Sequence, residues 1–407
     1  MKLTAEEKKM YSGAHGSAVQ TAMEILVALG EIYGAKRMVP VSSVQVSGVS
    51  YHNLGDAGLE FLEELAKEGK VRVLTTLNPA GMDLEDWKHL GISDDFAQKQ
   101  LKVISAFARM GITVSCTCTP YLVGNLPRFN DHLAWGESSA VTFANSVIGA
   151  RTNREGGPSA LAAALTGRTP AYGLHLDENR QAQILVKVNA NLSNTSDFSA
   201  LGWVLGKKFG TKIPFITGIR SATMEELKSL CAALPTYGGP SLFHIKGITP
   251  NKTRKPKELA VIEQRDIDEA YNALNEEEDV VDFVAIGCPH ASINEIRRIA
   301  ELLKGRSVKA EFWIATARQT KELADRAGYS KIIEDAGAKF ACDTCMAVAP
   351  LKGRFRVMAI DSAKGCYYAR GSNGFKTRFG TLEQCVEAAV NGRWSASEDK
   401  KMQKPDL

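Results

Sequence analysis

Residues 281–316 read VDFVAIGCPHASINEIRRIAELLKGRSVKAEFWIAT, and this stretch decides the fold class. It begins with the apolar run VDFVAIG and ends with KAEFWIAT, and each run has the length of a buried strand. Between them, 292–305 carries apolar residues at helical spacing, with Ser292 at the N-cap and a glycine after the last turn. A strand–helix–strand unit predicts two parallel strands joined by a right-handed crossover.

The same alternation extends in both directions along the chain. A helical pattern at 318–337 leads into strand patterns at 338–342 and 355–361. Earlier strands are expected at 37–48, 70–79, 112–121, 184–190, 213–217 and 241–247, with helical patterns between them. The sequence therefore predicts an α/β protein built of parallel-sheet βα units in several subdomains.

The length of the chain requires more than one domain. Its 407 residues exceed the roughly 250–300 residues at which a single core stops growing. We expect an N-terminal α/β region at 1–185, a middle region with a charged connection at 186–280, a C-terminal α/β region at 281–394 and a loose tail at 395–407.

Composition excludes several classes of partner. Charged residues make up 24% of the chain and the net charge is only +4, so nucleic acid is not an expected ligand. The basic run at 251–257 has no aromatic residues interleaved with it, as a nucleic-acid surface would have. The opening segment lacks the apolar core of a signal peptide, and no apolar run reaches the ~20 residues of a membrane helix. We expect a cytoplasmic protein, without a membrane partner, whose eight cysteines are reduced.

Three cysteines follow apolar strand patterns: Cys118, Cys288 and Cys345. Ligands bind at the carboxyl ends of parallel strands, so these three thiols are candidates for one site. Zinc prefers two close pairs, a spacing that one CTC, one CDTC and a single cysteine do not match. Thiolates from three separate loops suit an iron–sulfur cluster with one iron left unligated by protein, while another metal or purely structural cysteines are the alternatives.

The other cysteines have different patterns. Cys231 and Cys385 lie on apolar helix faces and are expected in the core, whereas Cys366 fits either the core or the site.

The most distinctive polar stretch is 134–157, AWGESSAVTFANSVIGARTNREGG. Its small-residue centre predicts a buried helix that carries Asn145 and Ser146. Arg151 and Arg154 offer bidentate donors for carboxylate or phosphate, and the following glycines can present backbone N–H groups to an anion. The alternative is a buried polar network that only organises the core.

Five motifs together resemble one known family. GESSAVTFANSVIGARTNREGG, CTPY, GCPHAS, DTCMAVAP and DSAKGCYYA look like the large, catalytic component of the aconitase X family. The resemblance covers nearly the whole chain and implies an aconitase-superfamily-like fold. It also implies a hydro-lyase that dehydrates small anionic hydroxy acids with an iron–sulfur cluster, for which we expect the 4Fe–4S form. The family's cluster ligands correspond to Cys118, Cys288 and Cys345, and we do not extend that role to Cys116 or Cys342.

The resemblance also implies a partner and a substrate. Aconitase-like enzymes need a small swivel domain with a catalytic serine, for which this chain has no room, so we expect a separate small subunit in a heterodimer. Separate large subunits of the family dehydrate (R)-5-phosphomevalonate to trans-anhydromevalonate 5-phosphate in the archaeal mevalonate pathway of isoprene biosynthesis. The alternatives are dehydration of another hydroxy acid, such as cis-3-hydroxy-L-proline, and a non-enzymatic iron-sensing protein.

Several residues are candidates for roles in such a site. The base is expected to be a serine of the small subunit, with Ser47 as a rival, and Glu137 either orients a ligand or caps a helix. His15 and His290 are candidate site residues, while Tyr121 is expected to pack. The residues expected to hold the substrate are Ser138, Asn145, Ser146, Arg151, Asn153, Arg154 and Lys364, the last of which is equally compatible with a surface lysine.

Overall fold

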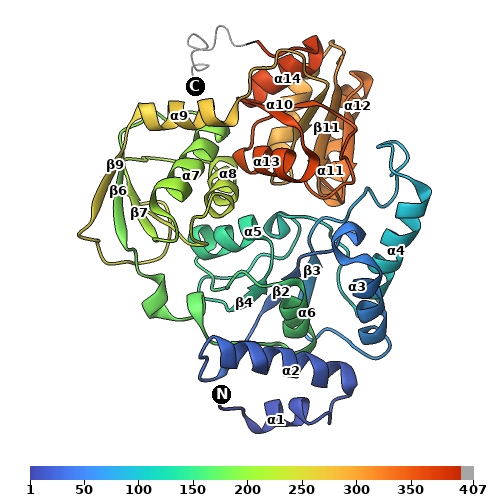
Figure 1. The fold of residues 1–407 in the computed structure, drawn as a ribbon, viewed down its shortest axis with the longest axis vertical. Coiled ribbons are helices and arrows are strands. Elements are labelled where there is room, and N and C mark those ends of the chain that lie inside the picture. The colour runs from blue at the N-terminus through green and yellow to red at the C-terminus, as the bar shows by residue number, and fades with distance from the viewer. Residues whose placement is uncertain (396–407) are drawn as a thin grey trace.

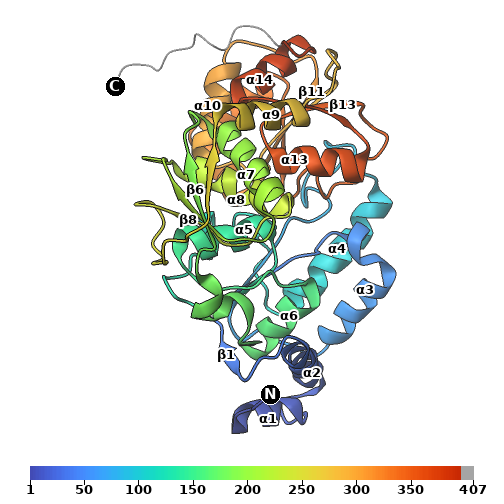
Figure 2. The ribbon, with the colours of Figure 1, turned by 60° about the vertical axis from the view of Figure 1, so that its left-hand side comes forward.

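The computed structural model describes residues 1–395, which form three parts that meet at the middle of the molecule (Figure 1). We call them the first part (1–180), the second part (184–274) and the third part (283–391). The N-terminal helices lie at the end of the molecule opposite the third part in both ribbon views (Figures 1 and 2). The tail expected at 395–407 lies outside the described residues, apart from Ser395.

The first part contains a small parallel sheet. Its elements are α1 (Ala5–Tyr11), α2 (Ser17–Ile32), β1 (Met38–Pro40), β2 (Ser43–Val46), α3 (Tyr51–Leu65), β3 (Leu74–Leu77), α4 (Asp94–Arg109), β4 (Leu133–Trp135), α5 (Ser138–Phe143), α6 (Gly157–Thr166) and β5 (Arg168–Pro170). The strand order β3–β2–β4 is parallel throughout, and β1 pairs separately with β5 in the antiparallel sense. The single strand expected at 37–48 is therefore two strands, because Pro40 lacks the N–H that would continue the ladder.

The second part is a four-stranded parallel sheet with helices against it. Its elements are β6 (Ile184–Val188), α7 (Thr195–Phe209), β7 (Pro214–Thr217), α8 (Met224–Thr236), β8 (His244–Ile245), β9 (Leu259–Ile262) and α9 (Gln264–Leu274). The strand order is β8–β7–β6–β9. The charged connection expected before the third part thus contains a strand, β9. It lies at the edge of the sheet and is partly exposed, which is compatible with the charged residues before and after it in the sequence.

The third part confirms the strand–helix–strand reading of 281–316. Its elements are β10 (Phe283–Ile286), α10 (Ile293–Leu303), β11 (Glu311–Thr316), α11 (Arg318–Arg326), α12 (Tyr329–Asp335), β12 (Lys339–Cys342), β13 (Val357–Ile360), α13 (Ala363–Tyr368), β14 (Lys376–Phe379) and α14 (Leu382–Asn391). All five strands are parallel in the order β12–β11–β10–β13–β14. The predicted fold class, parallel sheets in several subdomains, is confirmed.

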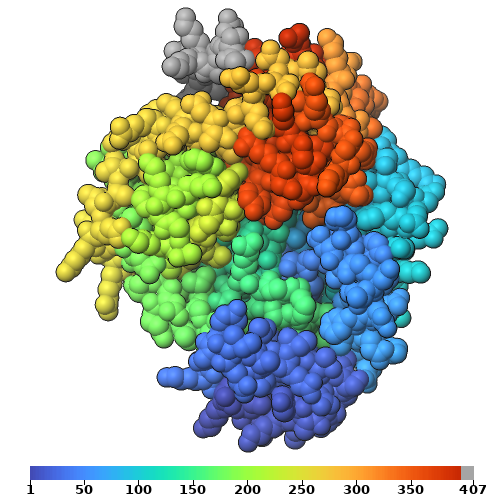
Figure 3. All heavy atoms as spheres, viewed as in Figure 1, coloured from blue at the N-terminus to red at the C-terminus, as the bar shows by residue number. Residues whose placement is uncertain are grey.

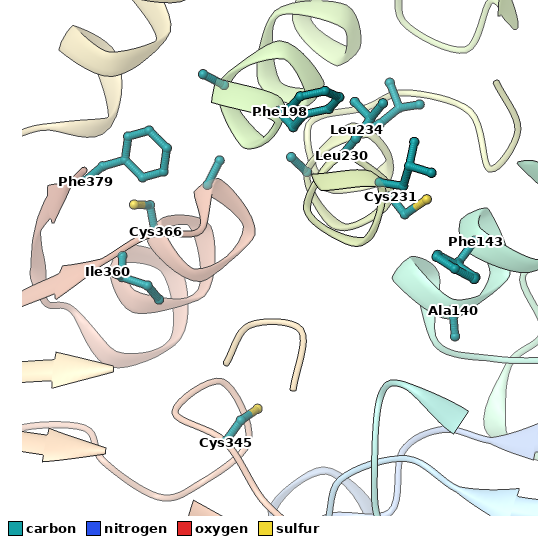
Figure 4. Packing of buried hydrophobic residues seen from close by; sticks show 14 of the residues in the cluster. Ala140, Phe143, Phe198, Leu230, Cys231, Leu234, Cys345, Ile360, Cys366 and Phe379 are labelled. Atoms are coloured by element: carbon teal, nitrogen blue, oxygen red, sulfur yellow. The ribbon is translucent and has the colours of Figure 1, made fainter. Parts of the chain in front are cut away.

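One hydrophobic core joins the three parts. Helix α8 packs against both α7 and α5, so the second part rests on the first. Figure 4 shows Phe143 from α5, Leu230 from α8 and Ile360 from β13 around this core. Each fully buried large apolar side chain contributes about 1.5–3 kcal/mol to stability, so the parts hold one another in place. The space-filling view shows the three parts meeting around teal residues of the α5 region (Figure 3).

Two further expectations concern the core and the membrane. Cys231, Cys366 and Cys385 are all fully buried among apolar side chains. Within residues 1–395, no helix is both long and apolar enough to cross a membrane.

Candidate active site

A cavity of about 280 Å³ lies between the first and third parts. The carboxyl ends of their parallel strands face it, which is where open sheets place their ligands. Ser47 follows β2, Asn78 follows β3 and Glu137 lies just after β4. From the third part, Cys288 and Lys364 come shortly after β10 and β13. Two sheets therefore contribute strand ends to one cavity.

The three cysteines expected at one site all line this cavity: Cys118, Cys288 and Cys345. The prediction that Cys118 follows a strand at 112–121 is wrong. Only Thr113 of this segment bridges to the neighbouring β3. The chain then leaves the strand path, with Cys116 at a positive φ of 40°. The apolar run before Cys118 therefore pointed to the right cavity, although this run forms almost no strand.

Burial raises the pKa of each of the three thiols, to about 12 for Cys288. Metal binding requires deprotonated thiolates, so a bound metal would displace three protons here. The backbone N–H of His290 donates to Cys118 Sγ at 3.2 Å, which is the kind of hydrogen bond that stabilises a ligating sulfur.

The donor set fits a cluster better than a single ion. Among residues 1–395, no group of three or more His, Cys, Asp or Glu side chains is arranged to hold one metal ion. One zinc ion would need its sulfurs about 3.8 Å apart, from Zn–S bonds of about 2.3 Å in a tetrahedron. The cysteines that hold a cluster bind different irons, so three cysteines that line one cavity fit a cluster. Cys342 instead lines a separate cavity beside Asp83 and Arg318, so no ligand role falls to it.

A buried ion pair crosses the cavity wall. The Lys364 ammonium contacts the Glu137 carboxylate and lies 3.3 Å from Ser138 Oγ, and Asn78 Nδ2 donates to Glu137 Oε2 at 2.9 Å. Burial alone would raise the pKa of Glu137, but the Lys364 charge and these donors lower it to about 2. Burial opposes the charge of Lys364 too, yet Glu137 raises its pKa. Both side chains are therefore ionised in the folded protein, and Lys364 is not a surface lysine.

Glu137 also accepts a hydrogen bond from the backbone of Ser139, at 3.3 Å, as the N-cap of α5. The expected role of Glu137 as a helix cap is therefore seen in the structure, and the same carboxylate holds Lys364.

Arg154 is the free cation of this cavity. It is exposed, lines the cavity and makes no hydrogen bond or ion pair with any residue in 1–395. Two other cavities are larger, about 420 and 440 Å³, and each contains an arginine that is already paired, although Arg37 in the second is also unpaired within residues 1–395. Arg318 contacts Asp83 and Asp343 in one, and Arg151 pairs with Asp177 in the other. The cysteine cavity combines an unpaired arginine with three thiols, which neither of these two cavities does.

Four residues expected to hold the substrate do not line this cavity: Asn145, Ser146, Arg151 and Asn153. Asn145 bridges the carbonyls of Thr152 and Ser241 at 2.9 and 3.0 Å, and Ser146 Oγ accepts the backbone N–H of Phe243. These bonds satisfy buried backbone groups where the second part meets the first. The alternative of a buried polar network thus describes these two residues.

Arg151 and Asn153 have equally local roles. The Arg151 guanidinium donates to Asn130 and to Asp177, and Asn153 holds the 172–174 turn through two backbone bonds. His15, another candidate, pairs with Glu6 at 2.9 Å in the N-terminal segment and does not line the cavity. Tyr121 packs, as expected, by stacking on Phe143.

Sequence reasoning missed four polar residues that line the cavity: Asn53, Asn78, Tyr368 and Ser372. Asn78 directly follows β3, so the rule that selected the cysteines could have found it. Its Oδ1 is buried without a hydrogen-bond partner, which marks it as a polar atom left for a ligand. Asn53 and Ser372 lie on helical or loop segments and carry no comparable signal.

The geometry defines an α/β protein in which three cysteines, a buried ion pair and an unpaired arginine line one cavity, and comparisons with known proteins specify the family. Models of the aconitase X first, second and third domains match residues 1–178, 182–272 and 281–391. The chain belongs to the aconitase X family.

Individual relatives are similar over nearly the whole chain. The Methanosarcina mazei phosphomevalonate dehydratase large subunit is 47% identical, covering 97% of this chain and 98% of the relative. A Pseudomonas aeruginosa cis-3-hydroxy-L-proline dehydratase is 35% identical over 96% of this chain but only 70% of the relative. The crystal structure of Thermococcus kodakaraensis aconitase X in its holo-form superposes with a TM-score of 0.89 at 46% identity, covering 96% of this chain and 100% of that chain.

Proposed function

We propose that this chain is the large subunit of a phosphomevalonate dehydratase, a hydro-lyase of the mevalonate pathway. It would convert (R)-5-phosphomevalonate into trans-anhydromevalonate 5-phosphate and water. The observation that carries the proposal is similarity in both sequence and length. Four phosphomevalonate dehydratase large subunits are 46–47% identical over at least 91% of this chain and 94% of the relative.

A second substrate class is less well supported. Two cis-3-hydroxy-L-proline dehydratases are 33% and 35% identical, and this chain spans 69% and 70% of their lengths. The unpaired Arg154 favours a substrate with an extra anionic group, since a guanidinium binds phosphate or carboxylate through two parallel hydrogen bonds.

The site residues would divide the work as follows. Cys118, Cys288 and Cys345 would hold a 4Fe–4S cluster, which supplies a Lewis acid for the departing hydroxyl. Arg154 would bind one anionic end of the substrate, and the Lys364 ammonium, held in place by Glu137, would provide a fixed positive charge inside the cavity. Ser138 and Asn78 would complete the polar wall around the substrate.

The proton acceptor is proposed to come from the partner. Ser47 lines the cavity but makes no hydrogen bond to a basic group within residues 1–395, so nothing in that part of the chain activates it as a base. Glu137 is a poor base because five atoms that can donate surround it and its pKa is about 2. We therefore assign the base to a small swivel-domain subunit, in a cytoplasmic heterodimer, and a substrate contact to Ser47.

The experiment uses anaerobically purified protein, alone and with its small subunit. Iron, sulfide and the visible spectrum are measured first, and dehydration of 5-phosphomevalonate and of cis-3-hydroxy-L-proline is assayed next. A brown protein that dehydrates phosphomevalonate only with the small subunit is the expected result.

The other outcomes are equally decisive. If the protein dehydrates cis-3-hydroxy-L-proline but not phosphomevalonate, cis-3-hydroxy-L-proline becomes the proposed substrate. A brown protein inert on both would refute the phosphomevalonate assignment, and inertness towards hydroxy acids in general would favour an iron-sensing role. A chain that binds no iron after anaerobic reconstitution would refute the cluster assignment of the three cysteines.

A further inference from the structure

His290 lies between the loops that carry the three cysteines. It is fully buried, two residues after Cys288 in the third part. Its Nδ1 lies 2.9 Å from the Thr117 hydroxyl, next to Cys118 in the first part. Its Nε2 lies 3.0 Å from the carbonyl oxygen of Thr344, next to Cys345. One imidazole ring therefore links the segments of all three cysteines.

Chemistry assigns the direction of each bond. The carbonyl of Thr344 can only accept, so Nε2 carries the proton and donates to it. Nδ1 is then the acceptor, and the Thr117 hydroxyl donates to it. The Thr117 oxygen in turn accepts from the backbone N–H of Thr119, at 3.2 Å. Both ring nitrogens are thus used, and neither is left for a cluster sulfur.

The turn that carries His290 is also held from outside. The Lys228 ammonium, from α8 in the second part, donates to the carbonyl oxygen of His290 at 2.9 Å and forms an ion pair with Glu295. The backbone N–H of His290 donates to Cys118 Sγ at 3.2 Å. Ring, N–H and carbonyl of one residue therefore connect all three parts of the chain.

We propose that His290 is a positioning residue that sets the spacing of the three cysteine loops. This inference deepens the proposed function and rests on its cluster assignment. The ring acts through Thr117 and Thr344 rather than by contact with the cluster. Its loss would let the Cys118 and Cys345 loops move independently, and iron would leave faster. Substituting residues that orient metal ligands typically weakens metal binding by about 10- to 100-fold.

The test compares variants that remove one bond or both. The Gln amide of H290Q can replace the Nε2–H donor, the Asn amide of H290N can replace the Nδ1 acceptor, and H290A replaces neither. On anaerobically purified full-length chains, the rate of iron loss to a chelator is followed by bleaching of the cluster absorbance. We expect an acceleration of about 10-fold or more for H290A, with H290Q and H290N in between.

A matched control separates positioning from general destabilisation. His244 is also buried, and its Nε2 donates one hydrogen bond, at 2.9 Å, to the Arg180 carbonyl, but it does not line the cavity. H244A, which removes this bond as H290A removes those of His290, should lower the thermal midpoint without changing the rate of iron loss. If H290A does not fold, T117V tests the same bond, because it removes only the hydroxyl that donates to Nδ1.

The outcomes distinguish the two levels of the proposal. Iron loss that is unchanged within twofold in H290Q, H290N and T117V, while the wild-type chain holds its cluster, would overturn the role of His290. Equal acceleration by H290A and H244A would overturn it too, because the effect would then follow stability alone. A wild-type chain without iron would overturn the cluster assignment and this inference with it.

Discussion

Replacing Lys364 by methionine should destabilise the protein more than removing both charges of its ion pair. The Lys364 and Glu137 side chains are only 7% and 13% exposed. In K364M, Glu137 would remain buried without its counter-charge, and such a loss costs about 3–5 kcal/mol. In a domain of 150–250 residues, each kcal/mol shifts the thermal midpoint by about 2–4 °C, so the expected loss is about 6–20 °C.

The double variant K364M/E137Q should recover at least half of this loss. A glutamine keeps the shape of Glu137 and can still accept from Asn78, but it buries no unpaired charge. The exposed pair of Lys331 and Asp335, at 2.9 Å with side chains 80% and 64% exposed, supplies the control. K331M should cost about 0.3–0.5 kcal/mol, as exposed pairs one helical turn apart do.

The assay is thermal unfolding of the four proteins, followed by circular dichroism in the absence of iron. A midpoint of the double variant equal to or below that of K364M would refute the reasoning. It would mean that the two groups are not coupled as ions and that Lys364 matters only for packing.

The remaining predictions concern the substrate, the cluster and pH. R154Q should reduce kcat/KM for the substrate by about 10- to 100-fold with little change in thermal midpoint. R151Q should lower the thermal midpoint and leave KM unchanged, because Arg151 is already paired with Asp177. The reverse result would exchange their roles. C118S should lose most of its iron, while C231S, altered at a buried cysteine away from the cavity, should keep it; equal iron in both would exclude Cys118 as a ligand. The pKa of Glu137 is lowered to about 2 from an ordinary 4.5, which contributes about 3 kcal/mol of stability above pH 4.5. This contribution is lost as the pH falls towards 2. A pH titration of unfolding should therefore show a smaller loss of stability for E137Q than for the wild-type chain between pH 4.5 and 2.

The fold class followed from local pattern alone. Alternating apolar runs and amphipathic helices such as 292–305 report the backbone period directly, because each element buries one face wherever it packs. The periodicity of the sequence did not predict the short elements correctly. The segment at 112–121 has a strand's composition but forms a single bridge, and β9 is only four residues long and lies within a charged stretch.

The sequence by itself singled out the three cysteines that line one cavity, because each follows an apolar run, even though they come from two parts of the chain and the run before Cys118 forms a single bridge. Only the tertiary structure decided which polar residues join them. Arg151 and Arg154 lie on one extended segment that bridges to His132 and Trp135, and an odd spacing along such a segment directs side chains to opposite faces. Arg154 therefore lines the cysteine cavity, while Arg151 pairs with Asp177 on the other face. Lys364 meets Glu137 across 227 positions of sequence. Contacts of this kind depend on how the three parts pack against one another, which local periodicity does not encode.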